Sequence, residues 1–340
     1  MSVGVAVIGA GHWGPNFIRN FENPPASHVV AVVDRDASRL SQVHSRFPQI
    51  AVSQDVREVW SDSRVDATII ATPTSTHYAL VKAALEAGKH VLVEKPITNN
   101  AAHAEELGDL AASVHRVLMV GHVFLYNAAV QRVRQYVQTG ELGRIYYISM
   151  LRTNLGPIRM DVNAAWDLAS HDISIANYWL GMTPVAASAV GGTWINAGVE
   201  DAVFTTLRYP YDILVNLHVS WLNPRKARDI TVAGEKRMLT FDDMNLSEPV
   251  RLYDRCVSHD RISPAFVDSF ASFRASIRDG DITIPRISSG EPLRTECEHF
   301  LKCIATGAEP CTGVREGLAV VRALEAIERS IRNAGREEKI

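Results

Sequence analysis

The sequence has no excess of charge of either sign. Its 35 Lys and Arg residues nearly balance its 38 Asp and Glu residues, for a formal net charge of -3. Proteins that bind nucleic acid or an anionic membrane usually carry a run or patch of basic residues. No run of five or six like charges occurs here, so we expect a small-molecule partner, with no nucleic acid and no membrane.

Cysteine and long hydrophobic runs are also scarce. The four cysteines all lie in the last third of the chain, without the C-x-x-C spacing of a zinc ribbon or a disulfide framework. No apolar stretch reaches the roughly 18 residues of a membrane span. The apolar start is interrupted by glycines and lacks the basic residues of a signal peptide. We therefore expect reduced thiols, no metal and a cytoplasmic location.

The first third of the chain alternates short apolar runs with helical stretches. Such runs, separated by about 15 to 30 residues, are typical of parallel strands buried on both faces and joined by helices. With 340 residues, 46% of them hydrophobic, the chain is long enough for two cores. We predict a dinucleotide-binding Rossmann domain, a doubly wound parallel α/β sheet, over residues 1–122.

After residue 122 the pattern changes. A predicted helix over 127–138 is followed by a strand over 145–152 and, after the helix at 166–181, by several consecutive strand-like runs. The last part of the chain has two further helical stretches, 291–306 and 316–332. Consecutive strands with few helices between them predict an antiparallel sheet, so residues 123–340 should form an α+β domain.

A glycine-rich motif, GAGHWG, occupies residues 9–14. It directly follows a predicted strand and opens a predicted helix whose first turn holds Pro15, where a missing N–H costs least. Glycines here permit a tight turn, close approach of a pyrophosphate, and close helix–strand packing. The alternative is a glycine turn without a ligand. The predicted cofactor-binding residues are Gly9, Gly11, His12, Trp13 and Gly14.

An acidic residue, Asp34, ends the second predicted strand. A carboxylate at this place accepts hydrogen bonds from the adenosine ribose hydroxyls. We expect NAD, because the 2′-phosphate of NADP would meet like charge. The neighbouring Arg35 keeps NADP open as the alternative, since a guanidinium could bind that phosphate.

The segment HVLVEKP places Glu94 and Lys95 at the carboxyl end of a predicted parallel strand. Open α/β sheets bind their ligands at this edge. A lysine there could hold a substrate oxygen or exchange a proton with it. The alternative for Lys95 is a solvated turn residue.

The stretch WDLASHDISIANYWLG, residues 166–181, predicts a helix that ends at Gly181. His171 falls on its apolar stripe, and Asp167 lies one turn earlier, so both could reach one substrate atom. Alternatively, Asp167 caps the helix and His171 is a core histidine bonded to a carbonyl. A metal site is disfavoured, because the pair has no third ligand at a recognisable spacing, although Asp172 is close.

Together these motifs resemble the Gfo/Idh/MocA family of oxidoreductases, named after glucose-fructose oxidoreductase and inositol dehydrogenase. The likeness spans about residues 1–185 and rests on GAGHWG, Asp34, TPTSTHYALVKAALEAGKHVLVEKP, GHVFLYNAAV and WDLASHDIS. It implies a Rossmann domain, a second domain built on a large open sheet that forms homodimer or homotetramer contacts, and oxidation of a CH–OH group with NAD.

The resemblance also implies roles for single residues. Lys95 would be catalytic and Glu94 would contact the nicotinamide ribose. Asp167 would orient a sugar hydroxyl and His171 would exchange its proton, although the base stays open between His171 and Lys95. Residues placed near the cofactor by the resemblance are Thr72, Pro73 and His77.

The substrate is predicted from the segment before the Asp–His pair. Amides suit sugar hydroxyls, arginines suit a phosphate or carboxylate, and a tryptophan can stack on a sugar or base. The alternative is a polar surface loop. The candidate substrate-binding residues are Tyr126, Arg152, Asn154, Arg159, Asn163 and Trp166. Tyr126 lies in a segment that resembles the commoner family pattern G-H-x-x-R-F-N-P. This chain has Leu125 and Ala128 in place of the arginine and the proline of that pattern.

Within the family, N-L-G followed by D-V-N-x-x-W-D-L-A-x-H-D resembles members from polysaccharide and amino-sugar pathways, which oxidise a nucleotide-linked sugar at C3. We expect a UDP-N-acetylhexosamine or its uronic acid as substrate. A dehydrogenase of a free sugar or inositol is the nearer alternative, and a non-enzymatic NAD-binding sensor the more distant one.

Overall fold

The computed structural model describes residues 2–22, 26–160, 162–257, 277–288 and 290–340. The chain divides into two compact units. The first unit comprises residues 1–126 and 290–322, and the second comprises 127–289 and 323–340. The boundary predicted after residue 122 left residues 290–322 with the second domain, whereas their contacts group them with the first unit.

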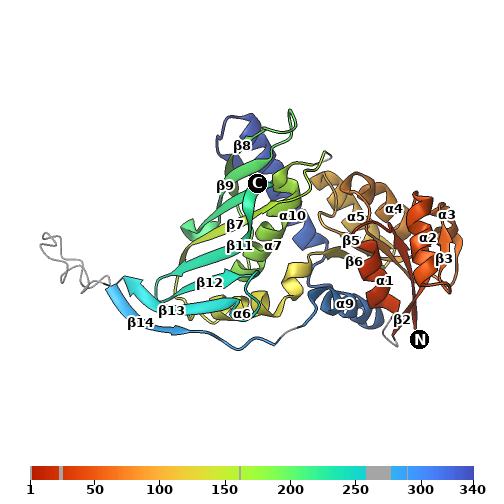
Figure 1. The fold of residues 1–340 in the computed structure, drawn as a ribbon, viewed down its shortest axis with the longest axis horizontal. Helices are drawn as coiled ribbons and strands as arrows, with labels where there is room; N and C mark the ends of the chain where they lie inside the picture. Colours follow the sequence, from red (N-terminus) through yellow and green to blue (C-terminus); the bar gives the residue numbers. More distant parts are fainter. Residues whose placement is uncertain (1, 23–25, 161, 258–276, 289) are drawn as a thin grey trace, which may run out of the picture. The chain divides into compact units, whose positions relative to one another are not determined.

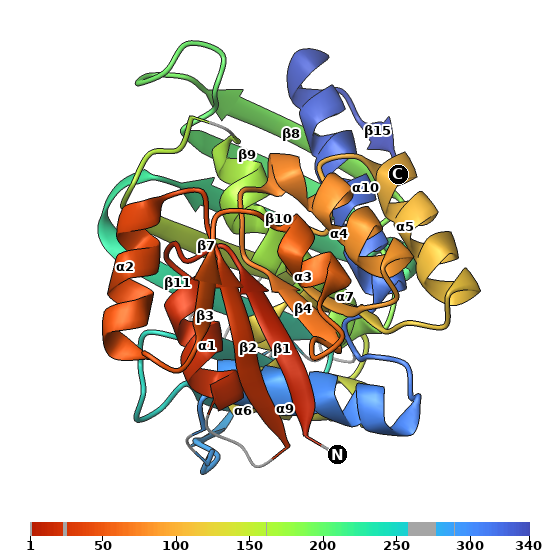
Figure 2. The same ribbon diagram turned by 90° about the vertical axis from the view of Figure 1, so that its right-hand side faces the viewer.

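The first unit is built on a six-stranded sheet in the order β3-β2-β1-β4-β5-β6, and all its strand pairs are parallel. Figure 2 shows β1, β2 and β3 side by side, with α1 and α2 beside them. The predicted Rossmann sheet is confirmed. The elements in chain order are β1 Val3–Ile8, α1 Gly14–Glu22, β2 Ser27–Val33, α2 Ala37–Arg46, β3 Ala51–Ser53, α3 Arg57–Ser61, β4 Ala67–Ile70, α4 His77–Glu86, β5 His90–Glu94, α5 Ala101–Ser113, β6 Leu118–Gly121 and α9 Pro292–Thr306.

The alternation of side chains along the strands separates two apolar layers. Val5 and Val7 of β1 face a core that contains apolar residues of α1, α2 and α9, while Ala6 faces a smaller cluster with Val59 of α3. Period-2 alternation in a strand buried on both faces produces this arrangement. Phe300 of α9 packs in the larger core, which explains why this late helix joins the first unit.

The second unit is built on a nine-stranded sheet in the order β14-β13-β12-β11-β7-β10-β9-β8-β15. Its pairs are antiparallel except β7 with β10, so the predicted mostly antiparallel sheet is confirmed. Figure 1 shows β7 to β14 running side by side. The elements are α6 Ala128–Gln138, β7 Ile145–Leu155, α7 Ser170–Leu180, β8 Ala186–Gly192, β9 Ala202–Arg208, β10 Leu214–Ser220, β11 Leu222–Gly234, β12 Met238–Asp242, β13 Val250–Val257, β14 Ile277–Thr283 and β15 Glu338–Lys339, and α10 Val314–Arg332 runs from the first unit into this one.

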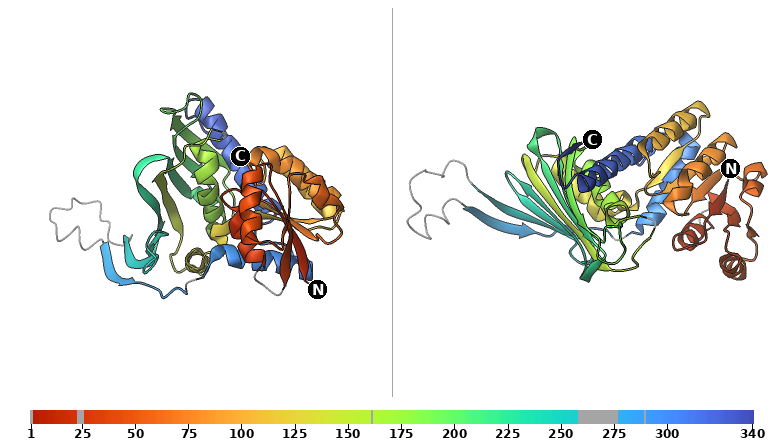
Figure 3. Two further views of the ribbon diagram at one scale, coloured as in Figure 1. Left: turned by 45° about the vertical axis from the view of Figure 1, so that its right-hand side comes forward. Right: turned by 90° about the horizontal axis from the view of Figure 1, so that it is seen from above.

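The helices of the second unit lie on one face of its sheet, as the view from above in Figure 3 shows. Trp179 of α7 is fully buried, and its ring packs edge-on against Phe241 of β12. The opposite face leaves large apolar side chains exposed, among them Tyr147, Phe204 and Val190. The predicted end of α7 is confirmed, because Gly181 takes the left-handed conformation that closes a helix. In the described part of the chain, every helix is too short or too polar to cross a membrane.

Candidate functional site

The glycine loop joins β1 to α1, and two of its three glycines are required by the protein itself. Gly9 has φ +99°, and a Cβ there would lie 2.5 Å from the carbonyl oxygen of Ala71. A Cβ on Gly14 would lie 2.1 Å from the carbonyl oxygen of Gly9, so the helix could not approach the turn. At Gly11 the nearest atom is Nη1 of Arg39, at 3.5 Å, which is ordinary contact. The protein leaves space at Gly11, as a bound pyrophosphate requires.

Asp34 lies directly after β2 and faces this loop. One of its carboxylate oxygens accepts the Ala10 N–H at 2.7 Å and the other accepts the Asp36 N–H at 2.8 Å. Each carboxylate oxygen has a second acceptor position, so ribose hydroxyls can still donate to Asp34. Arg35 is exposed. Arg39, which the sequence analysis did not single out, lies 3.6 Å from Asp34 Oδ2.

The two residues between the glycines differ in burial. His12 is exposed, whereas Trp13 packs against the apolar core of the first unit and its carbonyl accepts the Asn16 and Phe17 N–H groups at the start of α1. The glycine loop, the start of α1 and Asp34 together suit a dinucleotide, because backbone N–H groups at a helix N-terminus favour phosphate.

A buried histidine joins the loops that follow β4 and β5. The His77 ring nitrogens lie 2.9 Å from the carbonyl oxygens of Thr72 and Pro96. Burial lowers the pKa of His77, and the carbonyl contacts oppose this shift. Pro73 precedes a single 3-10 turn between these contacts. The predicted T-P-x-x-x-H residues therefore brace the segment that contains Lys95.

Glu94 and Lys95 lie at the end of β5. The carboxylate of Glu94 accepts the Lys95 N–H at 3.2 Å, and Gly121 of the neighbouring strand lies against it. Desolvation by burial raises the pKa of Glu94 to about 7, and the Lys95 charge opposes this shift. Glu296 of α9 is fully buried; desolvation raises its pKa well above the usual value, and the Glu94 charge raises it further. The E-K-P motif therefore adjoins a buried acidic group of the first unit.

Asp167 occupies a single π-helical turn, Ala165–Ala169, that leads into α7. Its two carboxylate oxygens receive different donors. Arg159 Nη1 lies 3.2 Å from Oδ1, and Trp221 Nε1 donates to Oδ2 at 3.1 Å. Asp167 therefore does not cap α7, whose N-cap position is Ala169. π turns are rare and are frequent at functional sites.

Asn163 caps the turn instead. Its Oδ1 accepts the Trp166 N–H at 3.1 Å, and its Nδ2 donates to Glu200 at 2.7 Å. Trp166 is largely buried. These contacts assign Asn163 and Trp166 to holding the Asp167 turn, and Glu200 is a supporting residue that sequence reasoning missed because it lies 33 positions after Asp167 along the chain.

Arg152 is buried and donates from Nε and Nη2 to Oδ1 of Asp172, at 2.9 and 2.7 Å. This geometry favours a structural ion pair for both residues. The Tyr126 hydroxyl lies 3.0 Å from Thr312 Oγ1 inside the first unit, which favours a packing role. The partly exposed Asn154 lies over Gly156.

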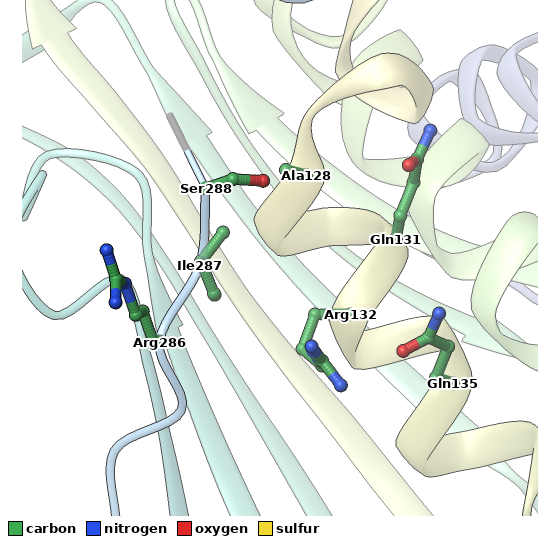
Figure 4. A pocket seen from close by; sticks show the side chains of 7 residues that line it. All are labelled: Ala128, Gln131, Arg132, Gln135, Arg286, Ile287 and Ser288. Atoms are coloured by element: carbon green, nitrogen blue, oxygen red, sulfur yellow. The ribbon is translucent and has the colours of Figure 1, made fainter. Parts of the chain in front are cut away.

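The predicted site residues divide between the two units. The second unit brings together Asp167, Arg159, Asn163 and Trp166, and His171 lies one helical turn beyond Asp167. The first unit contains the glycine loop, Asp34 and the region from Thr72 to Lys95. A separate pocket of about 650 Å³ lies between α6 and residues 286–288 and contains none of them (Figure 4). Within the described ranges no group of three or more His, Cys, Asp or Glu side chains could hold a metal ion.

Comparison with known proteins adds to this geometry. Residues 3–122 match the family model described as "Oxidoreductase family, NAD-binding Rossmann fold", and residues 130–240 match "GFO/IDH/MocA C-terminal domain". The chain is 27% identical over 327 residues, 94% of each chain, to UDP-N-acetylglucosamine 3-dehydrogenase from Acidithiobacillus ferrooxidans. It is 23% identical over 349 residues, 97% of each chain, to inositol 2-dehydrogenase from Rhizobium meliloti.

A solved structure shares this similarity. The solved structure is that of UDP-N-acetylglucosamine 3-dehydrogenase from Acidithiobacillus ferrooxidans. It matches this chain with a TM-score of 0.80 at 25% identity, and the match covers 98% of this chain and 99% of that one.

Proposed function

Because the chain belongs to the Gfo/Idh/MocA family of oxidoreductases, we propose that it oxidises C3 of a UDP-N-acetylhexosamine or its uronic acid with NAD. The observation that carries the reaction is the Asp167 carboxylate, held by Arg159 and Trp221 one helical turn before His171. The similarity over nearly the whole chain to a UDP-N-acetylglucosamine 3-dehydrogenase supports the substrate class.

The first unit suits NAD by its own geometry. The pyrophosphate would lie over Gly11, where a Cβ would be tolerated by the protein and would fill the space. Asp34 would accept the adenosine ribose hydroxyls, which favours NAD over NADP. Glu94 would accept a hydroxyl of the nicotinamide ribose. When bound, NAD supplies the acceptor for a hydride from the sugar carbon.

The proposed steps on the substrate belong to three side chains. His171 removes the hydroxyl proton as the C–H bond breaks, so the oxygen loses a proton, the carbon loses a hydride and the alcohol becomes a carbonyl. A histidine suits this exchange, because its ordinary pKa of about 6.5 lets it act in both directions near neutrality. Asp167 accepts a hydrogen bond that orients the hydroxyl, and the Lys95 ammonium holds the oxygen.

A substrate screen tests this proposal. Purified protein with NAD, and then NADP, is mixed with UDP-N-acetylhexosamines, their uronic acids, free hexoses and inositols, and the reduced nicotinamide is followed by absorbance. Turnover confined to UDP-sugars is expected. The similarity to inositol 2-dehydrogenase favours a free polyol as the second candidate, and turnover only on free polyols would replace the UDP-sugar.

The role of Lys95 is tested by Lys95→Met, which keeps the length of the side chain and removes its charge. Turnover should fall by roughly a thousandfold or more while the Kd for NAD stays within a few-fold, because the lysine is assigned to the substrate oxygen. Lys82→Met is a matched control, since Lys82 pairs with Glu106 on the surface. Near-normal turnover of Lys95→Met would remove Lys95 from the mechanism.

A further inference from the structure

Trp221 follows β10 directly and belongs to none of the sequence motifs described above. Its side chain is almost fully buried, at 1% exposed. Its indole Nε1–H donates to Oδ2 of Asp167 at 3.1 Å. An indole N–H is a donor only, so this contact favours one rotation of the Asp167 carboxylate.

The main chain of Trp221 is anchored to the segment that also supports the Asp167 turn. Its N–H donates to the carbonyl of Asp201 at 2.9 Å. The preceding residue, Glu200, holds Asn163, which caps the turn. One short segment, 200–201, therefore holds both Trp221 and the turn that contains Asp167, which Trp221 contacts.

The segment 200–201 is itself well held. Asp201 is fully buried, and its Oδ2 accepts the N–H groups of Trp194 and Ile195 at 2.6 and 2.9 Å. The Glu200 carbonyl also accepts the Ala164 N–H at 2.9 Å. The segment to which the Trp221 main chain is bonded is therefore itself fixed by several hydrogen bonds.

Arg159 and Trp221, which both donate to Asp167, differ in rigidity. Arg159 is about a third exposed and has a long flexible side chain. The Trp221 ring is buried and has only two rotatable bonds, so its N–H direction is set by packing.

We propose that Trp221 is a positioning residue: its indole N–H fixes the rotation of the Asp167 carboxylate, and with it the direction from which Asp167 meets the sugar hydroxyl. The proposal rests on the proposed function, because Asp167 is there assigned to the substrate. It adds a residue that touches neither substrate nor cofactor.

Trp221→Phe tests the proposal, because it keeps an aromatic ring, deletes the N–H and leaves no unpaired donor behind. A misplaced catalytic group costs up to about a hundredfold in rate, so kcat should fall about 10- to 100-fold. The Kd for NAD should stay within about twofold of wild type. Trp179→Phe is the matched control, since the Trp179 N–H donates to the Val130 carbonyl in the core at 2.8 Å; its kcat should stay within about threefold of wild type.

A double-mutant cycle separates positioning from packing. In the Asp167→Ala background there is no carboxylate to orient, so adding Trp221→Phe should change kcat by less than about twofold. A full further loss in that background would assign Trp221 a role independent of Asp167 and overturn the proposal. Near-normal kcat of Trp221→Phe alone would also overturn it.

A spectroscopic test does not depend on turnover. It can therefore be made even if the Trp221→Phe variant folds poorly. The indole N–H resonance of Trp221 in ¹⁵N-labelled protein should move on Asp167→Ala, while that of Trp179 stays in place. An unmoved Trp221 signal would show that the bond is absent. If the wild type oxidises no CH–OH substrate, the proposed function fails, whereas turnover that Trp221→Phe leaves unchanged defeats only the positioning role.

Discussion

Replacing each glycine of the nucleotide loop by alanine should separate its effect on folding from its effect on the ligand. At Gly14 the new methyl would lie 2.1 Å from the backbone oxygen of Gly9, so helix or turn must move. At Gly9 it would lie 2.5 Å from a backbone oxygen, at a φ of +99° that alanine avoids. At Gly11 it would meet only the end of the Arg39 side chain at 3.5 Å.

The expected changes follow from these distances. Overpacking against backbone costs about 1 to 3 kcal/mol, so Gly14→Ala should lower the free energy of unfolding by about 3 kcal/mol. Gly9→Ala adds conformational strain of about 1 to 2 kcal/mol to its clash. Gly11→Ala should cost nothing and can stabilise by about 0.4 to 1 kcal/mol, because alanine restricts the unfolded chain. For a unit of this size, 1 kcal/mol corresponds to about 2 to 4 °C in Tm.

Thermal unfolding of the three variants, with and without NAD, measures both effects. Gly14→Ala should melt about 6 to 12 °C below wild type. Gly11→Ala should melt at or slightly above the wild-type temperature and should bind NAD at least tenfold more weakly in calorimetric titration. Wild-type affinity in Gly11→Ala, or a loss of stability equal to that of Gly14→Ala, would refute the assignment of the space at Gly11 to the cofactor.

Two further predictions concern buried charges. Between pH 4.5 and 7 the folded chain keeps a proton on Glu94 that the unfolded chain has released, because burial raises the pKa of Glu94 to about 7. The contribution of Glu94 to the free energy of unfolding should therefore fall as pH rises through this window, by at most about 3.5 kcal/mol at ~1.4 kcal/mol per pKa unit. Glu94→Gln, followed by urea unfolding at several pH values, should make this slope shallower, while the contribution of the buried Glu296 remains; parallel curves for the two proteins would contradict it. Asp172→Asn removes the buried negative charge that pairs with Arg152 and should destabilise the protein by about 3 to 5 kcal/mol in urea unfolding. Asp229→Asn, which breaks the more exposed pair with Arg225, should cost less than about 1 kcal/mol, and equal losses would show that the burial of the Arg152 pair is not decisive.

The sheets and the glycine loop could be predicted from the sequence because their signals are local. Strand runs such as VGVAVI have an apolar pattern of their own, and the spacing of Gly9, Gly11 and Gly14 is set by one turn. The grouping of α9 with the first sheet could not be predicted, because it depends on contacts between Phe300 and residues almost 280 positions away, such as Phe21.

The candidate site shows the same division. Asp167 and His171 are visible as a pair within one helical turn, but the donors that hold Asp167 are not. Trp221 lies 54 positions later and has no spacing signal. Arg152 illustrates the converse: its residue type suits a phosphate, and only burial beside Asp172 shows that the charge is already paired.

The π turn before α7 makes the site depend on the number of residues as well as on their types. A π turn closes its hydrogen bonds over one more residue than an α turn does. Deleting one alanine from Ala164-Ala165 would let the turn become a regular helix and rotate Asp167 by about 100° around the axis relative to the Asn163 cap. Every candidate side chain would still be present, yet Asp167 would no longer face Trp221. A relative whose alignment with this chain has a one-residue gap between Asn163 and Asp167 would therefore retain the motif in its sequence without this arrangement.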